Sequence, residues 1–306
     1  MLRLPVLGVG RVEPALELGE TRLSSGRRMC WAMFGDSEGS PVFWFHGTPG
    51  NRTQIPPATA REAALLGIKL VCIARPGVGR SSDVAYPSFA AAAADVMEVA
   101  DDVGVRRFGV VALSGGGPYA LACAHQFPER VGAVAILGGV CPVAGPDAAD
   151  GGIVALSSRF NSILATLRVP LSATVRAAIG LMGPISHPAY QAFSRIMPEG
   201  DQRVFADPEV EAMFVRDLVA ANRHQFRGLF NDVVLFGRDW GFRLHELDVP
   251  VRWWHGDADS LVPLDHARHV TGLIPDCELL VRPEESHLGG FGVSSDVLSW
   301  LVEVAA

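Results

Sequence analysis

The chain has 306 residues, 49% of them hydrophobic and 19% charged, a composition that predicts a globular protein with a large core. Its net charge of −7 argues against nucleic-acid binding, because nucleic-acid-binding proteins carry a surplus of Lys and Arg. We expect no membrane span, since no run of about 18 uncharged apolar residues occurs. The first ten residues are too short and too often broken by Gly and Pro for a signal peptide. Five scattered cysteines without a C-x-x-C pair predict buried thiols and a cytoplasmic protein.

Strands and helices alternate through the first 140 residues. Helical periodicity predicts helices over 55–66, 88–103 and 116–127, the second with Ser88 as its N-cap. Apolar runs predict strands at 16–23, 28–34, 42–45, 69–74, 108–113 and 131–137, of which the first two form a hairpin. This alternation predicts a mostly parallel sheet with helices on both faces.

The pattern changes to all-helical between about Cys141 and Leu247. Helices are predicted at 153–167, 171–181, 188–197, 208–221 and 225–236. Apolar side chains of this stretch could line a pocket, although packing against the core is the commoner role for any one of them: Ile163, Leu164, Leu167, Val169, Leu171, Ile179, Leu181 and Met182. Strands return at Val249–Gly256 and Cys277–Val281.

The strand predicted at 108–113 runs directly into Ser114, which is followed by three glycines and a helix. A serine on such a strand-to-helix turn is held on a strained backbone, with its hydroxyl exposed at the top of the sheet. The turn needs small residues two positions before and after the serine, and Ala112 and Gly116 stand there. This pattern favours Ser114 as a nucleophile, provided that a base lies nearby.

Candidate acids and a candidate base follow the last two strands. Asp257 and Asp259 come at the end of the strand at 249–256, and His287 comes after the strand at 277–281. A histidine near its ordinary pKa can serve as base and then as acid close to neutral pH. Asp147 and Asp150, after an earlier strand, are alternative positions for the acid.

Together these segments resemble the α/β-hydrolases. Five pieces occur in the order of that family: His46-Gly47, the loop Arg75–Ser81, the turn at Ser114, the segment Gly256–Asp259, and His287. The chain order serine, acid, histidine is the order of that family. The resemblance therefore implies an α/β fold with a mostly parallel eight-stranded sheet, helices on both faces and an all-helical cap. It places the core domain at 1–140 and 248–306 and the cap at 141–247.

The resemblance also implies a role for each candidate. Ser114, Asp259 and His287 would be the catalytic triad, because the family's acid lies three residues after the glycine of the strand end, which selects Asp259. Asp257 would then make an Asx-type turn with its own loop. The backbone N–H groups of Thr48 and Gly115 would form the oxyanion hole. His46 would organise its loop rather than act in catalysis.

The implied activity is hydrolysis of an ester or related acyl bond through an acyl-enzyme, with a small or medium apolar acyl group under the cap. Alternatives on the same triad are a carbon–carbon bond hydrolase, a lactonase, a thioesterase, an aminopeptidase or a perhydrolase. A non-catalytic ligand-binding protein of this fold is a further alternative. The expected partner is a small ester-like molecule, and dimerisation through the cap stays open.

We predict no cofactor and no metal. The loop Arg75–Ser81 contains G-x-G, but Pro76 and the missing third glycine do not fit a dinucleotide-binding loop. His266 and His269 lie three apart on one predicted helix face. Without a companion acid pattern we interpret them as surface residues.

Overall fold

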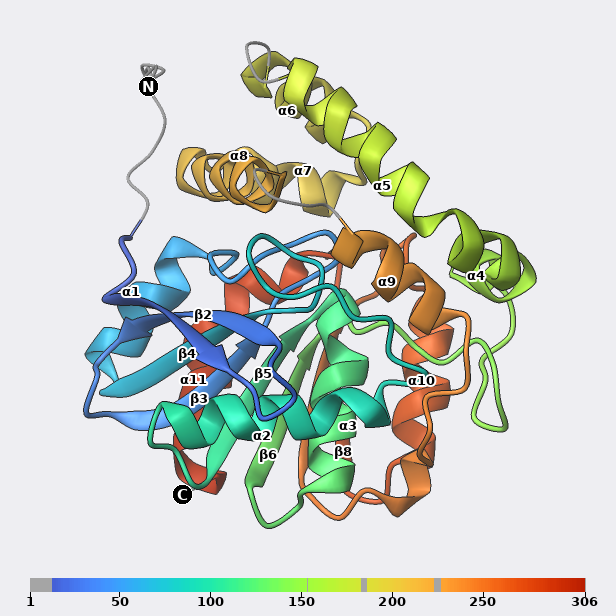
Figure 1. Ribbon diagram of the computed structural model, residues 1–306. Coiled ribbons are helices and arrows are strands. Elements are labelled where there is room, and N and C mark those ends of the chain that lie inside the picture. The colour runs from blue at the N-terminus through green and yellow to red at the C-terminus, as the bar shows by residue number, and fades with distance from the viewer. Residues whose placement is uncertain (1–12, 153, 183–185, 223–226, 306) are drawn as a thin grey trace.

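The computed structural model describes residues 13–152, 154–182, 186–222 and 227–305. Its centre is one eight-stranded sheet with the order β1-β2-β4-β3-β5-β6-β7-β8 (Figure 1). The pairs β1–β2 and β2–β4 are antiparallel, and all the other neighbours are parallel. The strands are β1 Glu17–Arg22, β2 Arg28–Gly35, β3 Ser40–Phe45, β4 Ile68–Ala74, β5 Phe108–Leu113, β6 Val131–Leu137, β7 Val251–Gly256 and β8 Cys277–Arg282. The predicted mostly parallel eight-stranded sheet is thus confirmed.

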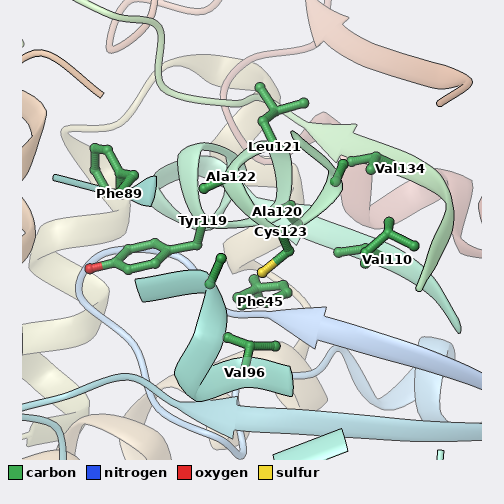
Figure 2. Close-up of a cluster of buried hydrophobic side chains, with 14 of the residues drawn as sticks. Phe45, Phe89, Val96, Val110, Tyr119, Ala120, Leu121, Ala122, Cys123 and Val134 are labelled. Atoms are coloured by element: carbon green, nitrogen blue, oxygen red, sulfur yellow. The ribbon is translucent and has the colours of Figure 1, made fainter. Parts of the chain in front are cut away.

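Helices cover both faces of the sheet, each over its own hydrophobic cluster. One cluster lies under α2 (Ala93–Asp102), α3 (Gly117–Gln126) and α10 (Leu264–Leu273), and the other under α1 (Pro57–Leu65) and α11 (Ser294–Val304). The central strands β5 and β6 are buried along their whole length, which explains their continuous apolar sequence. Figure 2 shows α3 packed through its small and apolar side chains against Phe45, Val110 and Val134.

The helix predicted at 88–103 begins differently from the expectation. A 3₁₀ turn, Ala90–Ala92, precedes α2, and no side chain caps the helix, so the prediction of Ser88 as the N-cap is wrong. The N–H of Ala90 donates instead to the carbonyl of Trp240, at 3.1 Å. A distant segment thus satisfies the backbone here, which a local capping rule does not anticipate.

Among the described residues between β6 and β7 there are six α-helices: α4 Ala155–Arg159, α5 Asn161–Met182, α6 Ser186–Arg195, α7 Glu199–Phe205, α8 Pro208–Asn222 and α9 Arg227–Phe236. They lie over one edge of the sheet, with α5 and α6 farther from it than α7, α8 and α9 (Figure 1). The sequence predicts two helices broken near Pro170, whereas α5 runs through this residue. Pro170 removes a backbone hydrogen bond, but α5 packs against α8 and α9, and this packing holds it together. The short helix α7 was not predicted.

This region exposes several large apolar side chains. Leu167 is 43% exposed, and Ile163 and Val169 are similarly exposed, so these three side chains, which could have lined a pocket, are open to solvent. Ile179 is partly buried against the core instead, and the side chains of Leu181 and Met182 lie outside the described residues. By length and composition the stretch Asn161–Gly180 could cross a membrane, with mean hydropathy 1.3 and 6% of it buried.

Candidate active site

Ser114 sits at the point where β5 ends and the helix α3 approaches. Its φ of +49° lies in the left-handed region, which is strained for a residue with a side chain. Two residues later, a Cβ on Gly116 would come 2.5 Å from the carbonyl oxygen of Phe45, so this position requires glycine. The Ser114 carbonyl accepts a hydrogen bond from the N–H of Val140 at 3.1 Å. The turn is therefore fixed from both sides.

Three predicted side chains meet beyond the carboxyl ends of β5, β7 and β8. Ser114 Oγ lies 2.8 Å from His287 Nε2, and His287 Nδ1 lies 2.7 Å from Asp259 Oδ2. A carboxylate only accepts hydrogen bonds, so Nδ1 carries the hydrogen and Nε2 is free to accept from the serine hydroxyl. The structure thus brings Ser114, His287 and Asp259 into one hydrogen-bonded chain.

Electrostatic interactions among these three residues favour an ionised Asp259 and a basic His287. Burial opposes the charge on Asp259, but the hydrogen bond and charge of His287 outweigh it and lower the pKa of the carboxyl. Burial likewise disfavours the imidazolium, yet Asp259, followed by the charge of Asp201, raises the pKa of His287 above its ordinary 6.5. The imidazole is therefore poised to accept a proton.

The other acids considered are placed elsewhere. Asp257 is exposed, and its Oδ1 accepts a hydrogen bond from the N–H of Glu284 at 2.8 Å. The predicted Asx-type turn is made not by Asp257 but by Asp259, whose Oδ1 accepts from two backbone N–H groups, those of Leu261 and Val262. Asp147 accepts from the N–H of Leu244. These contacts leave Asp259 as the carboxylate paired with His287.

The two residues predicted to form an oxyanion hole lie side by side. A Cβ at Gly115 would collide with the Thr48 hydroxyl and would come 2.8 Å from Cζ of Phe236. Gly115 is the second residue of the 3₁₀ turn Ser114–Gly116, where backbone N–H groups have no intrahelical acceptor. Thr48 donates its hydroxyl to Asp232 Oδ2 at 2.6 Å, so the side chain is engaged and only the N–H could face a substrate.

Asp232 belongs to a buried network that the sequence did not predict. It lies on α9 and is paired with Arg75 at 2.6 Å, and both side chains are almost fully buried. Arg75 also donates to the carbonyls of His46 and Gly47, and the Tyr119 hydroxyl donates to Asp232 Oδ1 at 2.8 Å. A buried carboxylate that accepts from Arg, Thr and Tyr has its charge compensated. The network therefore ties α9 to the loop that carries Thr48.

The remaining histidines near the site have structural partners. His46 is buried next to Arg75, and burial together with that charge lowers its pKa well below the ordinary value. His255 Nε2 lies 2.8 Å from the carbonyl of Val262, next to Asp259. The ring nitrogens of His266 and His269 contact the carbonyls of Asp150 and Asp147, and His266 is buried, so it is not a surface residue. Among the described residues, no group of three or more His, Cys, Asp or Glu is placed to hold a metal ion.

Comparison with known proteins identifies the family of the chain. The family model for the alpha/beta hydrolase fold matches residues 40–291, so the chain belongs to this family. A probable proline iminopeptidase from Streptomyces coelicolor is 24% identical over 91% of this chain and 97% of its own length.

Among solved structures, the esterase RhEst1 from Rhodococcus sp. ECU1013 has a TM-score of 0.68 at 20% identity and covers 94% of this chain and 99% of its own. A thermophilic esterase from Thermogutta terrifontis has a TM-score of 0.65 at 18% identity, covering 95% and 100%. At these identities the structures establish the fold. Together with the family they support a hydrolase.

Proposed function

We propose that the protein is a serine hydrolase that cleaves an ester or related acyl bond through an acyl-enzyme. The observation that carries the proposal is the continuous hydrogen-bonded chain from Ser114 through His287 to Asp259. The strained backbone at Ser114 supports it, because strain of this kind is retained where function requires it.

In the proposed reaction, Ser114 Oγ attacks the acyl carbon as its proton passes to His287 Nε2. Asp259 holds the imidazole and stabilises its charged form. The N–H groups of Thr48 and Gly115 donate to the oxyanion, and loss of one such donor costs about 2.7–4 kcal/mol of barrier. His287 then protonates the leaving group, and a water molecule releases the acyl group by the same steps.

An aminopeptidase acting on an N-terminal proline is the second candidate, suggested by the relative from Streptomyces coelicolor. Recognition of a free amine needs a carboxylate that is available to the substrate. The buried aspartates of three cap helices already accept hydrogen bonds from core loops: Asp201, Asp217 and Asp232. These three aspartates are therefore not available to a substrate amine, and we keep the ester as the first candidate.

Labelling with a fluorophosphonate probe tests the proposal directly. We expect wild-type protein to be labelled stoichiometrically and Ser114→Ala not at all, while Ser295→Ala, a change of an exposed serine on α11, is labelled like wild type. A folded wild-type protein that never labels would favour a non-catalytic ligand-binding role. A panel of p-nitrophenyl esters against proline p-nitroanilide separates the two candidate activities.

A further inference from the structure

The loop that carries His287 is held from the cap side by one short helix. We call residues 283–288, which follow β8, the histidine loop. Asp201 of α7 accepts from Ser286 Oγ at 3.0 Å through Oδ2 and from the N–H of Leu288 at 2.8 Å through Oδ1. One carboxylate therefore accepts hydrogen bonds from the residues immediately before and after His287.

Two neighbours of Asp201 on α7 also lie against the histidine loop. A Cβ at Gly200 would lie 2.7 Å from the backbone nitrogen of Ser286, so α7 approaches the histidine loop this closely only because residue 200 is glycine. Glycine within a helix costs about 0.5–1 kcal/mol relative to alanine, and the close approach offsets that cost. Arg203, two residues after Asp201, donates to the carbonyl of Glu284 at 2.9 Å. Three residues of α7 thus contact the histidine loop.

Asp201 also places charge beside the imidazole. Asp201 is 1% exposed. Its negative charge raises the pKa of His287, although less than Asp259 does. His255, which also interacts with Asp259 and His287, is buried with a lowered pKa and is neutral near pH 7. Two carboxylates, one from the core and one from the cap, therefore favour the charged form of His287.

We propose that Asp201 is a positioning residue for His287, through which the cap fixes the histidine loop and brings a second carboxylate to it. The inference rests on the proposed role of His287 as the general base. In this proposal α7 positions the general base and does not merely shield the site from solvent.

Inactivation by diisopropyl fluorophosphate tests this without knowledge of the substrate. The rate of inactivation of Ser114 falls at low pH as His287 becomes protonated. In Asp201→Asn the amide can still accept from Leu288, but the negative charge is gone. We call the low-pH side of the plot of inactivation rate against pH the acid limb. In Asp201→Asn we expect the acid limb to move to lower pH by roughly half a unit or more, because removing a nearby opposite charge disfavours the imidazolium.

Glu199→Gln is the matched control. It removes the same charge from the same turn of α7, but its side chain is 91% exposed and water screens it. Its acid limb should coincide with that of wild type. A merely structural role for Asp201 would lower the melting temperature and the rate at every pH without moving the limb. An unmoved limb in Asp201→Asn overturns the inference.

Ser286→Ala keeps the inference testable if Asp201→Asn does not fold. This change removes one hydrogen bond to Asp201 and leaves its charge in place. We expect a rate at optimal pH that is lower by about tenfold, since small misplacements of a catalytic group are costly, with the limb nearly unmoved. A wild-type rate in Ser286→Ala overturns the inference. Wild-type protein that is not labelled at Ser114 refutes the proposed function itself, which separates the two failures.

Discussion

The helical region between β6 and β7, which we propose to be a cap, has two parts that differ in how they meet the core. The inner cap comprises α7, α8 and α9, and each of these helices sends one buried aspartate to a core loop: Asp201, Asp217 and Asp232. The outer cap comprises α5 and α6, of which α5 exposes large apolar side chains such as Ile163 and Leu167. α5 reaches the core through Arg168, whose ion pair with Asp83 is partly exposed.

This difference suggests that the inner and the outer cap have different roles. A buried carboxylate costs several kcal/mol unless donors compensate it, so its position is fixed by where those donors lie. Apolar contacts are less directional and tolerate sliding. We infer that the inner cap fixes the geometry of the site, whereas the outer cap can vary without affecting the chemistry. Variants at graded distances from Ser114 test this division.

The largest effect is expected in the core itself. Asp259→Asn should lower turnover by about 10⁴-fold, because an asparagine favours the wrong tautomer of His287. The fold should survive, since the new side chain can still accept from Leu261 and Val262. Steady-state kinetics on a p-nitrophenyl ester measure the loss. Asp257→Asn is the control and should retain nearly full turnover, and equal losses at the two positions would contradict the assignment.

In the inner cap, Asp232→Asn should have the next largest effect. It leaves the Arg75 guanidinium buried without its counter-charge, and breaking a buried pair in this way costs about 3–5 kcal/mol. The Thr48 loop should shift as well, with activity falling about 100-fold. Asp239→Asn, just after α9 and in an exposed pair with Arg243, is the control. Denaturant unfolding and ester kinetics together would show whether the inner cap contributes to both stability and turnover.

Asp217 offers a test by pH. Burial raises the pKa of this carboxyl to about 7, although the Thr53 hydroxyl at 2.7 Å opposes the shift. The folded state therefore binds the proton more tightly than the unfolded state, and this contribution to stability is lost as pH rises from about 4 to about 7. Asp217→Asn keeps an acceptor for Thr53 and removes the titration. Its stability relative to wild type should increase by about 2–3 kcal/mol between pH 5 and pH 8.

Unfolding in urea at the two pH values measures this difference. Asp296→Asn, an exposed change on α11, should show no such trend. A constant difference between Asp217→Asn and wild type would mean that Asp217 is ionised throughout.

The sequence predicted the candidate site residues that carry a local signature. Ser114 follows a buried strand and precedes glycines, and Asp259 and His287 follow the two last strands, so strand order alone brings them to one edge of the sheet. Asp201 and Asp232 carry no such signature, because an acid on a helix normally marks its solvent face. Their partners, Ser286 and Arg75, lie 85 and 157 residues away in the chain. Only the assembled cap shows that these carboxylates are buried.

A smaller effect is expected at the acyl side of the site. Phe236 of α9 is the apolar cap residue found against Gly115, and its ring also stacks on Phe89 at 6.1 Å between centroids. Phe236→Leu should shift the preferred acyl length, with discrimination changed by about 1–3 kcal/mol. Labelling of Ser114 by a small organophosphate should be nearly unchanged. A p-nitrophenyl ester series from acetate upward measures the profile, and an unchanged profile would place the acyl group elsewhere.

The smallest effect is expected in the outer cap. Leu167 is 43% exposed, so Leu167→Ala removes little buried area, and surface changes of this kind usually alter stability by less than about 0.5 kcal/mol. Turnover, acyl preference and the acid limb should all match wild type, because α5 sends no side chain to the triad among the hydrogen bonds of the described residues. The measurement compares the ester-length profile and the melting curve of Leu167→Ala with those of Phe236→Leu. A shifted acyl profile in Leu167→Ala would show that the outer cap closes onto the substrate, and the division of the cap into a fixed inner and a variable outer part would be wrong.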